Sequence, residues 1–117
     1  MQPQQLLPVT PEILAQQQLN AYNARNIDAF LEPYSDSVRI YAFPDKLLYQ
    51  GKETMRKQYS GMFESVKELH CQLVNRIVQG DTVIDQENVT GFGDQPLKAI
   101  AIYKIRQGKI AEVYFIQ

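Results

Sequence analysis

The hydrophobic pattern of the chain changes its period once, near Leu69, and this change limits the folds open to it. Before Leu69, apolar residues recur at helical spacing; after it, they alternate with period two between turn signals. The turn signals at Gly80-Asp81, 91–96 and Gln107-Gly108 divide the second part into four expected strands. Helices followed by an antiparallel meander predict an α+β fold, with helices packed on one face of a curved sheet. The expected strands cover 69–79, 82–91, 97–106 and 110–117.

The first part of the chain carries clear helix start signals. Thr10-Pro11-Glu12 combines a hydroxyl N-cap, a proline at the first helical position and an acid in the first turn, and this helix should end near Asn26. Asn26 can cap a short second helix, and a third helix should follow Gly51. Between them the sequence predicts a strand at 38–43 and a short extended segment at 47–49. The apolar stripes are Leu14, Ala15, Leu19 and Tyr22; then Ile27, Phe30, Leu31 and Tyr34; then Met55, Tyr59, Met62 and Phe63.

Length and charge restrict the classes of partner. The 117 residues, 44% hydrophobic and 21% charged, suit one domain covering 1–117. Twelve basic and thirteen acidic residues give a net charge of −1 without a basic run, so we expect neither nucleic-acid nor membrane binding. The start, MQPQQLLPVT, lacks the features of a signal peptide or a membrane span, and a single cysteine cannot form an internal disulfide, so we expect a cytoplasmic protein. With one histidine and no nucleotide, flavin or metal motif, we expect no cofactor.

Residues 69–91 place ionisable side chains on a predicted hairpin. A two-residue turn at Gly80-Asp81 sets Arg76 opposite Asp85 and Val74 opposite Glu87. Strand alternation then puts His70, Arg76, Asp85 and Glu87 on one face and Cys71 on the other. Because no base shares its expected face, Cys71 is interpreted as a core residue.

Two interpretations of the charged face remain open. In one, the face lines a pocket, Arg76 keeps Asp85 or Glu87 ionised as a base, and His70 or Tyr59 donates a proton. In the other, Arg76 and Asp85 form an ordinary cross-strand pair on a convex face at a dimer contact, and His70 is a rim residue.

An amide on an apolar helix stripe is a further signal. Gln18 falls within the stripe of the first helix, where an unsatisfied amide would cost about 1–3 kcal/mol. It should therefore line a pocket or have a buried partner. Tyr34 and Tyr59 also lie on apolar stripes, either as packing residues with satisfied hydroxyls or as pocket residues.

The element order, with the segments LNAYNARNIDAFLEPYSDSV, YQGKETMRKQY and AIAIYKIRQGKIAEVYFI, resembles the nuclear transport factor 2-like superfamily, in its SnoaL-like and ketosteroid-isomerase-like branch. The resemblance covers nearly the whole chain. It implies a cone-shaped fold in which a strongly bent, mostly antiparallel sheet and three N-terminal helices enclose a pocket, and a homodimer formed through the sheet face. Members include isomerases, cyclases, hydrolases and binding domains, so the resemblance does not select one function.

The steroid isomerases of this branch can be compared residue by residue. Their two supporting tyrosines match Tyr34 and Tyr59, and their catalytic tyrosine falls on Gln18. Their general-base aspartate and their protonated aspartate fall on Ala42 and Ala101. Alanine can neither move a proton nor donate a hydrogen bond, so steroid isomerisation by that mechanism is not expected.

The resemblance implies a small-molecule pocket protein. We expect a cofactor-free acid–base isomerase, cyclase or hydrolase acting on a small, largely apolar metabolite; the alternative is a non-catalytic ligand-binding or regulatory dimerisation domain. The last strand alternates apolar side chains to both faces, which also favours a homodimer. The candidate catalytic residues are His70, Asp85, Glu87 and Tyr59, and the candidate ligand contacts are Gln18, Tyr34, Arg76, Ala42, Ala101 and Tyr103.

Overall fold

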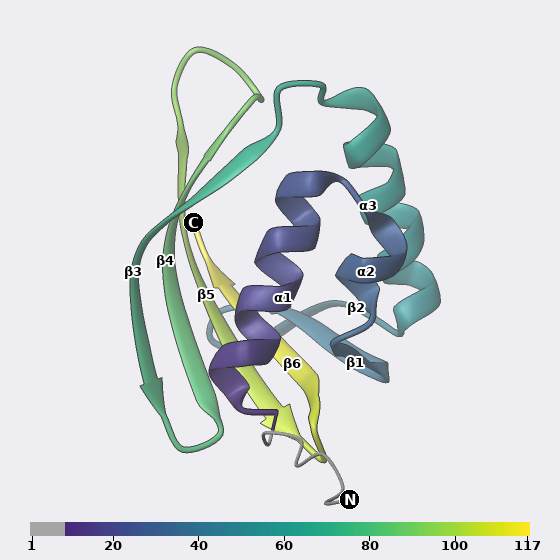
Figure 1. The fold of residues 1–117 in the computed structure, drawn as a ribbon, viewed down its shortest axis with the longest axis vertical. Coiled ribbons are helices and arrows are strands. Elements are labelled where there is room, and N and C mark those ends of the chain that lie inside the picture. The colour runs from purple at the N-terminus through teal and green to yellow at the C-terminus, as the bar shows by residue number, and fades with distance from the viewer. Residues whose placement is uncertain (1–8) are drawn as a thin grey trace, which may run out of the picture.

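The computed structural model describes residues 9–117, which form three helices on one side of a curved sheet of six strands (Figure 1). The first eight residues, which belong to the N-terminal stretch examined above for a signal peptide, lie outside the described residues. The elements are α1 Pro11–Ala24, α2 Ile27–Leu31, β1 Tyr34–Ala42, β2 Lys46–Gln50, α3 Lys52–Ser65, β3 His70–Gln79, β4 Thr82–Thr90, β5 Leu97–Arg106 and β6 Lys109–Ile116.

The helix starts confirm the local capping signals. The Thr10 hydroxyl accepts a hydrogen bond from the Ile13 amide at 3.2 Å, and the Asn26 side chain accepts one from the Ala29 amide at 3.2 Å. The prediction that Tyr34 lies on the stripe of α2 is wrong. That helix ends at Leu31, before Pro33, and Tyr34 begins β1 opposite Ile110 of β6.

The strand order is β2-β1-β6-β5-β4-β3, with β1 and β6 parallel and every other neighbouring pair antiparallel. The four predicted C-terminal strands are confirmed within two residues at each end. The segment at 47–49, expected only to be extended, belongs to β2, which pairs with β1 at the edge of the sheet. The early part of the chain therefore contributes two strands and not one.

A β-bulge in β3 changes which side chains share a face. The predicted pairing of Arg76 with Asp85 is confirmed, but Glu87 pairs with Leu73 and not with Val74. The register shifts between Leu73 and Asn75, so Val74 is the extra residue. Odd-numbered residues before the bulge and even-numbered residues after it therefore point to the same face of the strand.

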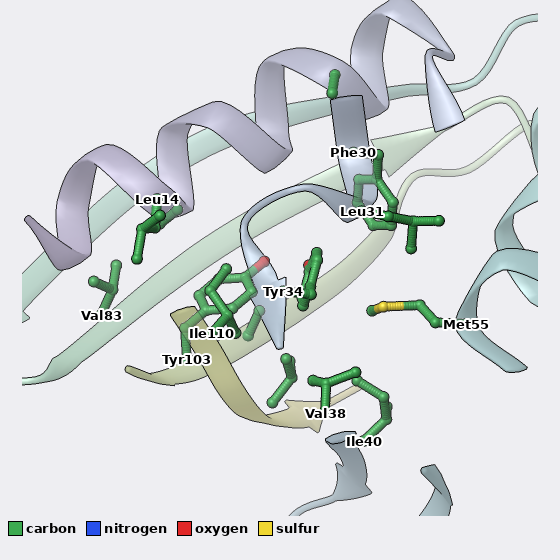
Figure 2. Packing of buried hydrophobic residues seen from close by; sticks show 14 of the residues in the cluster. Leu14, Phe30, Leu31, Tyr34, Val38, Ile40, Met55, Val83, Tyr103 and Ile110 are labelled. Carbon is green, nitrogen blue, oxygen red and sulfur yellow. The ribbon is translucent and has the colours of Figure 1, made fainter. Parts of the chain in front are cut away.

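The hydrophobic core lies between the helices and the concave face of the sheet. Figure 2 shows part of it, with Tyr34 and Tyr103 among aliphatic side chains from helices and strands. Full burial of one Leu or Phe side chain stabilises the fold by about 1.5–3 kcal/mol, so this cluster fixes the helices on the sheet. Within residues 9–117, no helix combines the length and the hydropathy that crossing a membrane requires.

Candidate functional site

A cavity of about 220 Å³ lies between the helices and the concave face of the sheet. Its walls are mostly apolar and aromatic, with few polar groups, as in many small-molecule sites. The lining residues are Gln18, Leu19, Tyr22, Phe30, Tyr34, Tyr59, Met62, Cys71, Glu87, Val89, Phe92, Leu97, Ala99, Tyr103, Phe115 and Gln117.

Glu87 is the acidic side chain in this lining, and its residue is only 6% exposed. Burial raises the pKa of its carboxyl from 4.5 to about 7, and the nearby charge of Asp85 acts in the same direction. The Cys71 thiol and the Arg76 guanidinium oppose the shift without cancelling it. At neutral pH the Glu87 carboxyl is therefore divided between its charged and neutral forms, as an acid–base catalyst requires.

The Arg76–Asp85 pair lies on the concave face, beneath α1. Asp85 is fully buried, and the Arg76 Nε and Nη2 atoms donate to its two oxygens at 2.7 and 2.9 Å. The Arg76 Nη1 atom also donates to the Gln16 side chain on α1 at 2.8 Å. The interpretation of this pair as a convex-face contact is therefore wrong, because the bulge turns Arg76 inward. Neither side chain lines the cavity. The pair instead lies next to the cavity and joins β3, β4 and α1 there.

Gln18 connects two tyrosines and is 4% exposed. Its Nε2 atom donates to the Ala15 carbonyl at 3.0 Å and to the Tyr103 hydroxyl oxygen at 3.1 Å, and its Oε1 atom accepts from the Tyr34 hydroxyl at 3.1 Å. A backbone carbonyl can only accept, so the contact with Ala15 fixes which end of the amide is nitrogen. Gln18 both lines the cavity and has buried partners.

The direction of this network leaves the proton of Tyr103 available. The Tyr103 oxygen accepts from Gln18, and within residues 9–117 its own O–H donates to no acceptor. Burial raises the pKa of Tyr103 well above 10.0, so the phenol stays protonated. Tyr103 can therefore donate a hydrogen bond to a ligand oxygen in the cavity.

Cys71 shares the cavity with Glu87, which sequence reasoning missed. Asn23 of α1 holds this part of β3 by accepting from the Cys71 amide at 2.8 Å and donating to its carbonyl at 2.9 Å. Cys71 is buried as expected, but the argument that no base shares its face is wrong. Burial, followed by the charge of Glu87, raises the pKa of the thiol, which therefore stays neutral and poorly nucleophilic.

Aromatic rings from the three helices close one side of the cavity. The Phe30 and Tyr59 ring centroids lie 4.6 Å apart, and the Tyr22 and Phe63 centroids lie 5.5 Å apart with the two rings nearly perpendicular. Burial raises the pKa of Tyr59 well above 10.0, so its hydroxyl is also neutral. Mutual packing of this kind holds the wall in place before any ligand arrives.

Besides Arg76 and Asp85, three more predicted site residues lie outside the cavity lining. His70 is exposed and faces away from Glu87, because it precedes the bulge that separates its face from that of Arg76. Ala42 ends β1 and lines a separate pocket with Phe43 and Leu48. Ala101 is fully buried in the core opposite Asp85. The predicted common face of His70 and Glu87 is therefore wrong, whereas Glu87, Tyr59, Gln18, Tyr34 and Tyr103 do come together.

Among residues 9–117, no three His, Cys, Asp or Glu side chains are grouped so that they could hold a metal ion.

Comparisons with known proteins agree with this geometry. A structure described as an uncharacterised cystatin-fold protein from Novosphingobium aromaticivorans superposes with a TM-score of 0.87 at 21% identity, covering 94% of this chain and all of the other. A proposed polyketide cyclase from Sinorhizobium meliloti gives a TM-score of 0.76 at 17% identity, covering 94% and 95% of the two chains. A proposed SnoaL-like polyketide cyclase from Jannaschia sp. CCS1 gives 0.74 at 17% identity, covering 97% and 90%.

At these identities the similar structures establish the fold alone. No match was found among proteins of curated function. The model of the SnoaL-like domain, however, matches residues 15–113, a range that includes most of α1, the bulged hairpin and every polar residue of the cavity lining except Gln117. By its sequence and by its helix-covered curved sheet, the chain belongs to the SnoaL-like domain family.

Proposed function

We propose that this SnoaL-like domain binds a small, largely apolar carbonyl compound in the inner cavity and catalyses proton transfer on it, with Glu87 as the acid–base group. The observation that carries the proposal is the Glu87 carboxyl, which lines an apolar cavity with a pKa of about 7. A carboxylate kept in such surroundings without a cationic partner of its own is costly, and such costs concentrate at functional sites.

The groups in the cavity suit enolisation of a ketone. The Tyr103 hydroxyl would donate to the carbonyl oxygen, while the Glu87 carboxylate removes a proton from the adjacent carbon. The electrons of the broken C–H bond form the enolate C=C bond, and the carbonyl π electrons move to the oxygen. In an isomerisation the Glu87 carboxylic acid then returns its proton to a different carbon of the enolate. In a ring closure the enolate carbon instead bonds to a second carbonyl carbon of the substrate, the π electrons of that carbonyl move to its oxygen, and the Glu87 proton goes to this alkoxide.

A ligand-binding domain without turnover is the alternative. A cavity lined by Gln18, alanines and apolar groups alone would have supported that alternative. Glu87 and the available Tyr103 proton instead support catalysis. Two structures with the same fold are described as proposed polyketide cyclases, and a base beside a hydrogen-bond donor suits carbonyl chemistry of that class.

Hydrogen–deuterium exchange of a simple ketone tests the proposal directly. The protein would be incubated with 2-hexanone in D₂O at pD 7, and loss of the protons next to the carbonyl would be followed by ¹H NMR. We expect the protein to accelerate exchange over buffer and Glu87→Gln to lose about 10²–10⁴-fold of that acceleration. Glu53→Gln, which removes an exposed carboxylate on α3, is the matched control.

Two results would contradict the proposal. One is an exchange rate equal to that of buffer for the wild-type protein at saturating ketone. The other is equal exchange by the wild-type protein and Glu87→Gln, which would assign any activity to a different group.

A further inference from the structure

A second hollow opens beside the inner cavity, between β2, α3 and the end of β6. It has a volume of about 410 Å³ and is more open to solvent than the inner cavity. Four side chains line both spaces, so the two hollows are adjacent and these side chains lie at their boundary. We call this second hollow the outer groove; its lining is shared through Tyr59, Met62, Phe92 and Phe115 and is completed by Ile40, Leu48, Tyr49, Gln58, Ser65 and Val66.

The outer groove is uncharged. None of its ten lining residues is Asp, Glu, Lys, Arg or His, and burial raises the pKa of the Tyr49 phenol to about 12, so that it too stays neutral. Leu48 and Phe92 are 51% and 47% exposed. Single exposed apolar residues are common, but these two lie in one groove that borders a mostly apolar cavity.

Phe92 lies at the boundary between the inner cavity and the outer groove, and the backbone before it is closely packed. The preceding Gly91 has φ +112 and packs so closely that a Cβ atom there would lie 2.8 Å from the backbone carbonyl of Glu68. This contact holds the start of the β4–β5 loop against the connection between α3 and β3. The position of Phe92 between the two spaces therefore follows from backbone packing.

The size of the inner cavity limits what it can hold. At about 30 Å³ for each water-sized group, about 220 Å³ accommodates roughly seven non-hydrogen atoms. A larger substrate whose reactive carbonyl lies near Glu87 and Tyr103 must extend past Phe92. On the far side of Phe92 lies the uncharged outer groove.

We propose that the substrate is an extended amphipathic carbonyl compound, with its carbonyl end in the inner cavity and an uncharged, narrow apolar tail of at least four carbons in the outer groove. This inference rests on the proposed function, because Glu87 and Tyr103 define which end enters. The outer groove then determines specificity by chain length.

A homologous series of ketones tests this inference. Binding of 2-hexanone, 2-octanone and 2-decanone would be measured by ¹H–¹⁵N NMR titration. Affinity should rise about fourfold for each fully buried methylene, and about twofold for each one in a groove open on one side. From 2-hexanone to 2-decanone we therefore expect roughly a 16-fold gain. The Cys71 and Ala99 amides should shift with each ketone, and the Leu48 and Gln58 amides with the longer ones.

Two neighbouring leucines provide a matched pair of variants. Leu48 lines the outer groove, whereas Leu47, the preceding residue of β2, is 49% exposed and lines none of the hollows described here. Leu48→Ser should reduce the gain from 2-hexanone to 2-decanone by at least threefold. Leu47→Ser should leave that gain unchanged.

Each outcome decides between the two proposals. If 2-hexanone binds and shifts the Cys71 amide but chain length has no effect, the extended substrate is wrong and the inner site stands. An equal effect of the two leucine variants on the chain-length gain would also overturn the extended substrate. If no ketone shifts the Cys71 or Ala99 amides, the proposed function itself fails.

Discussion

Replacing Glu87 by glutamine should change how the stability of the protein depends on pH. The folded-state pKa of Glu87 is about 7, against 4.5 for the free side chain. The folded protein therefore holds this proton more tightly than the unfolded chain does. The contribution of Glu87 to the free energy of unfolding should be highest below pH 4.5, fall as the pH rises to about 7, and then level off. At about 1.4 kcal/mol for each pH unit, the fall attributable to Glu87 is about 3 kcal/mol.

Glutamine keeps the size and polarity of the side chain but cannot ionise. The difference in unfolding free energy between Glu87→Gln and the wild-type protein should therefore move in favour of the variant by about 3 kcal/mol between pH 4 and pH 8. Urea denaturation followed by circular dichroism measures both proteins across this range. Because all other carboxylates are common to the two proteins, the difference isolates Glu87. If the wild-type protein and Glu87→Gln lost stability in parallel between pH 4 and pH 8, the claim that burial raises the pKa of Glu87 would be refuted.

Three further substitutions or measurements test other parts of the structure. Arg76→Met leaves the fully buried Asp85 without its partner and should lower stability by about 3–5 kcal/mol in thermal denaturation, whereas Lys104→Met, which breaks the exposed pair with Asp81, should leave Tm nearly unchanged. Gly91→Ala should cost more than about 1 kcal/mol, because φ is positive and the backbone of Glu68 is in the way, while Gly93→Ala, with no atom within 4 Å, should cost less; equal costs would contradict this. We expect a homodimer through the convex face of the sheet, where Ile84, Ile100 and Ile102 remain partly exposed, so sedimentation should give a dimer at micromolar concentration that Ile102→Glu converts to a monomer. A wild-type monomer at that concentration would count against it.

Local signals predicted the elements well because their causes are local. The capping side chains of Thr10 and Asn26 act within three residues, and the turns at 80–81 and 107–108 act between adjacent strands. Tyr34 was assigned to the wrong element because its pairing with Ile110 is decided by a strand far along the chain. The edge strand β2 was missed for the same reason, since it exists through its pairing with β1.

The site was predicted in part, and the bulge at Val74 explains most of the differences between the predicted and the observed site. Glu87, Gln18 and Tyr103 were named from pattern and resemblance, and all three line the cavity. The bulge at Val74 has no signature in the sequence, since the hydrophobic pattern of β3 fits either register. It turned His70 outward, brought Cys71 to the face of Glu87, and placed Arg76 under α1.

The parallel pairing of β1 with β6 has a consequence for the order in which the molecule assembles. β6 lies between β1 and β5, so the strand made last joins the β2-β1 pair to the β5-β4-β3 meander. Until residues 109–116 leave the ribosome, the two parts of the sheet have no common ladder, and the helices have no continuous surface to cover. The domain should consequently acquire its cooperativity only once β6 can pair with both neighbours, and a nascent chain arrested after Gln107 should remain sensitive to protease.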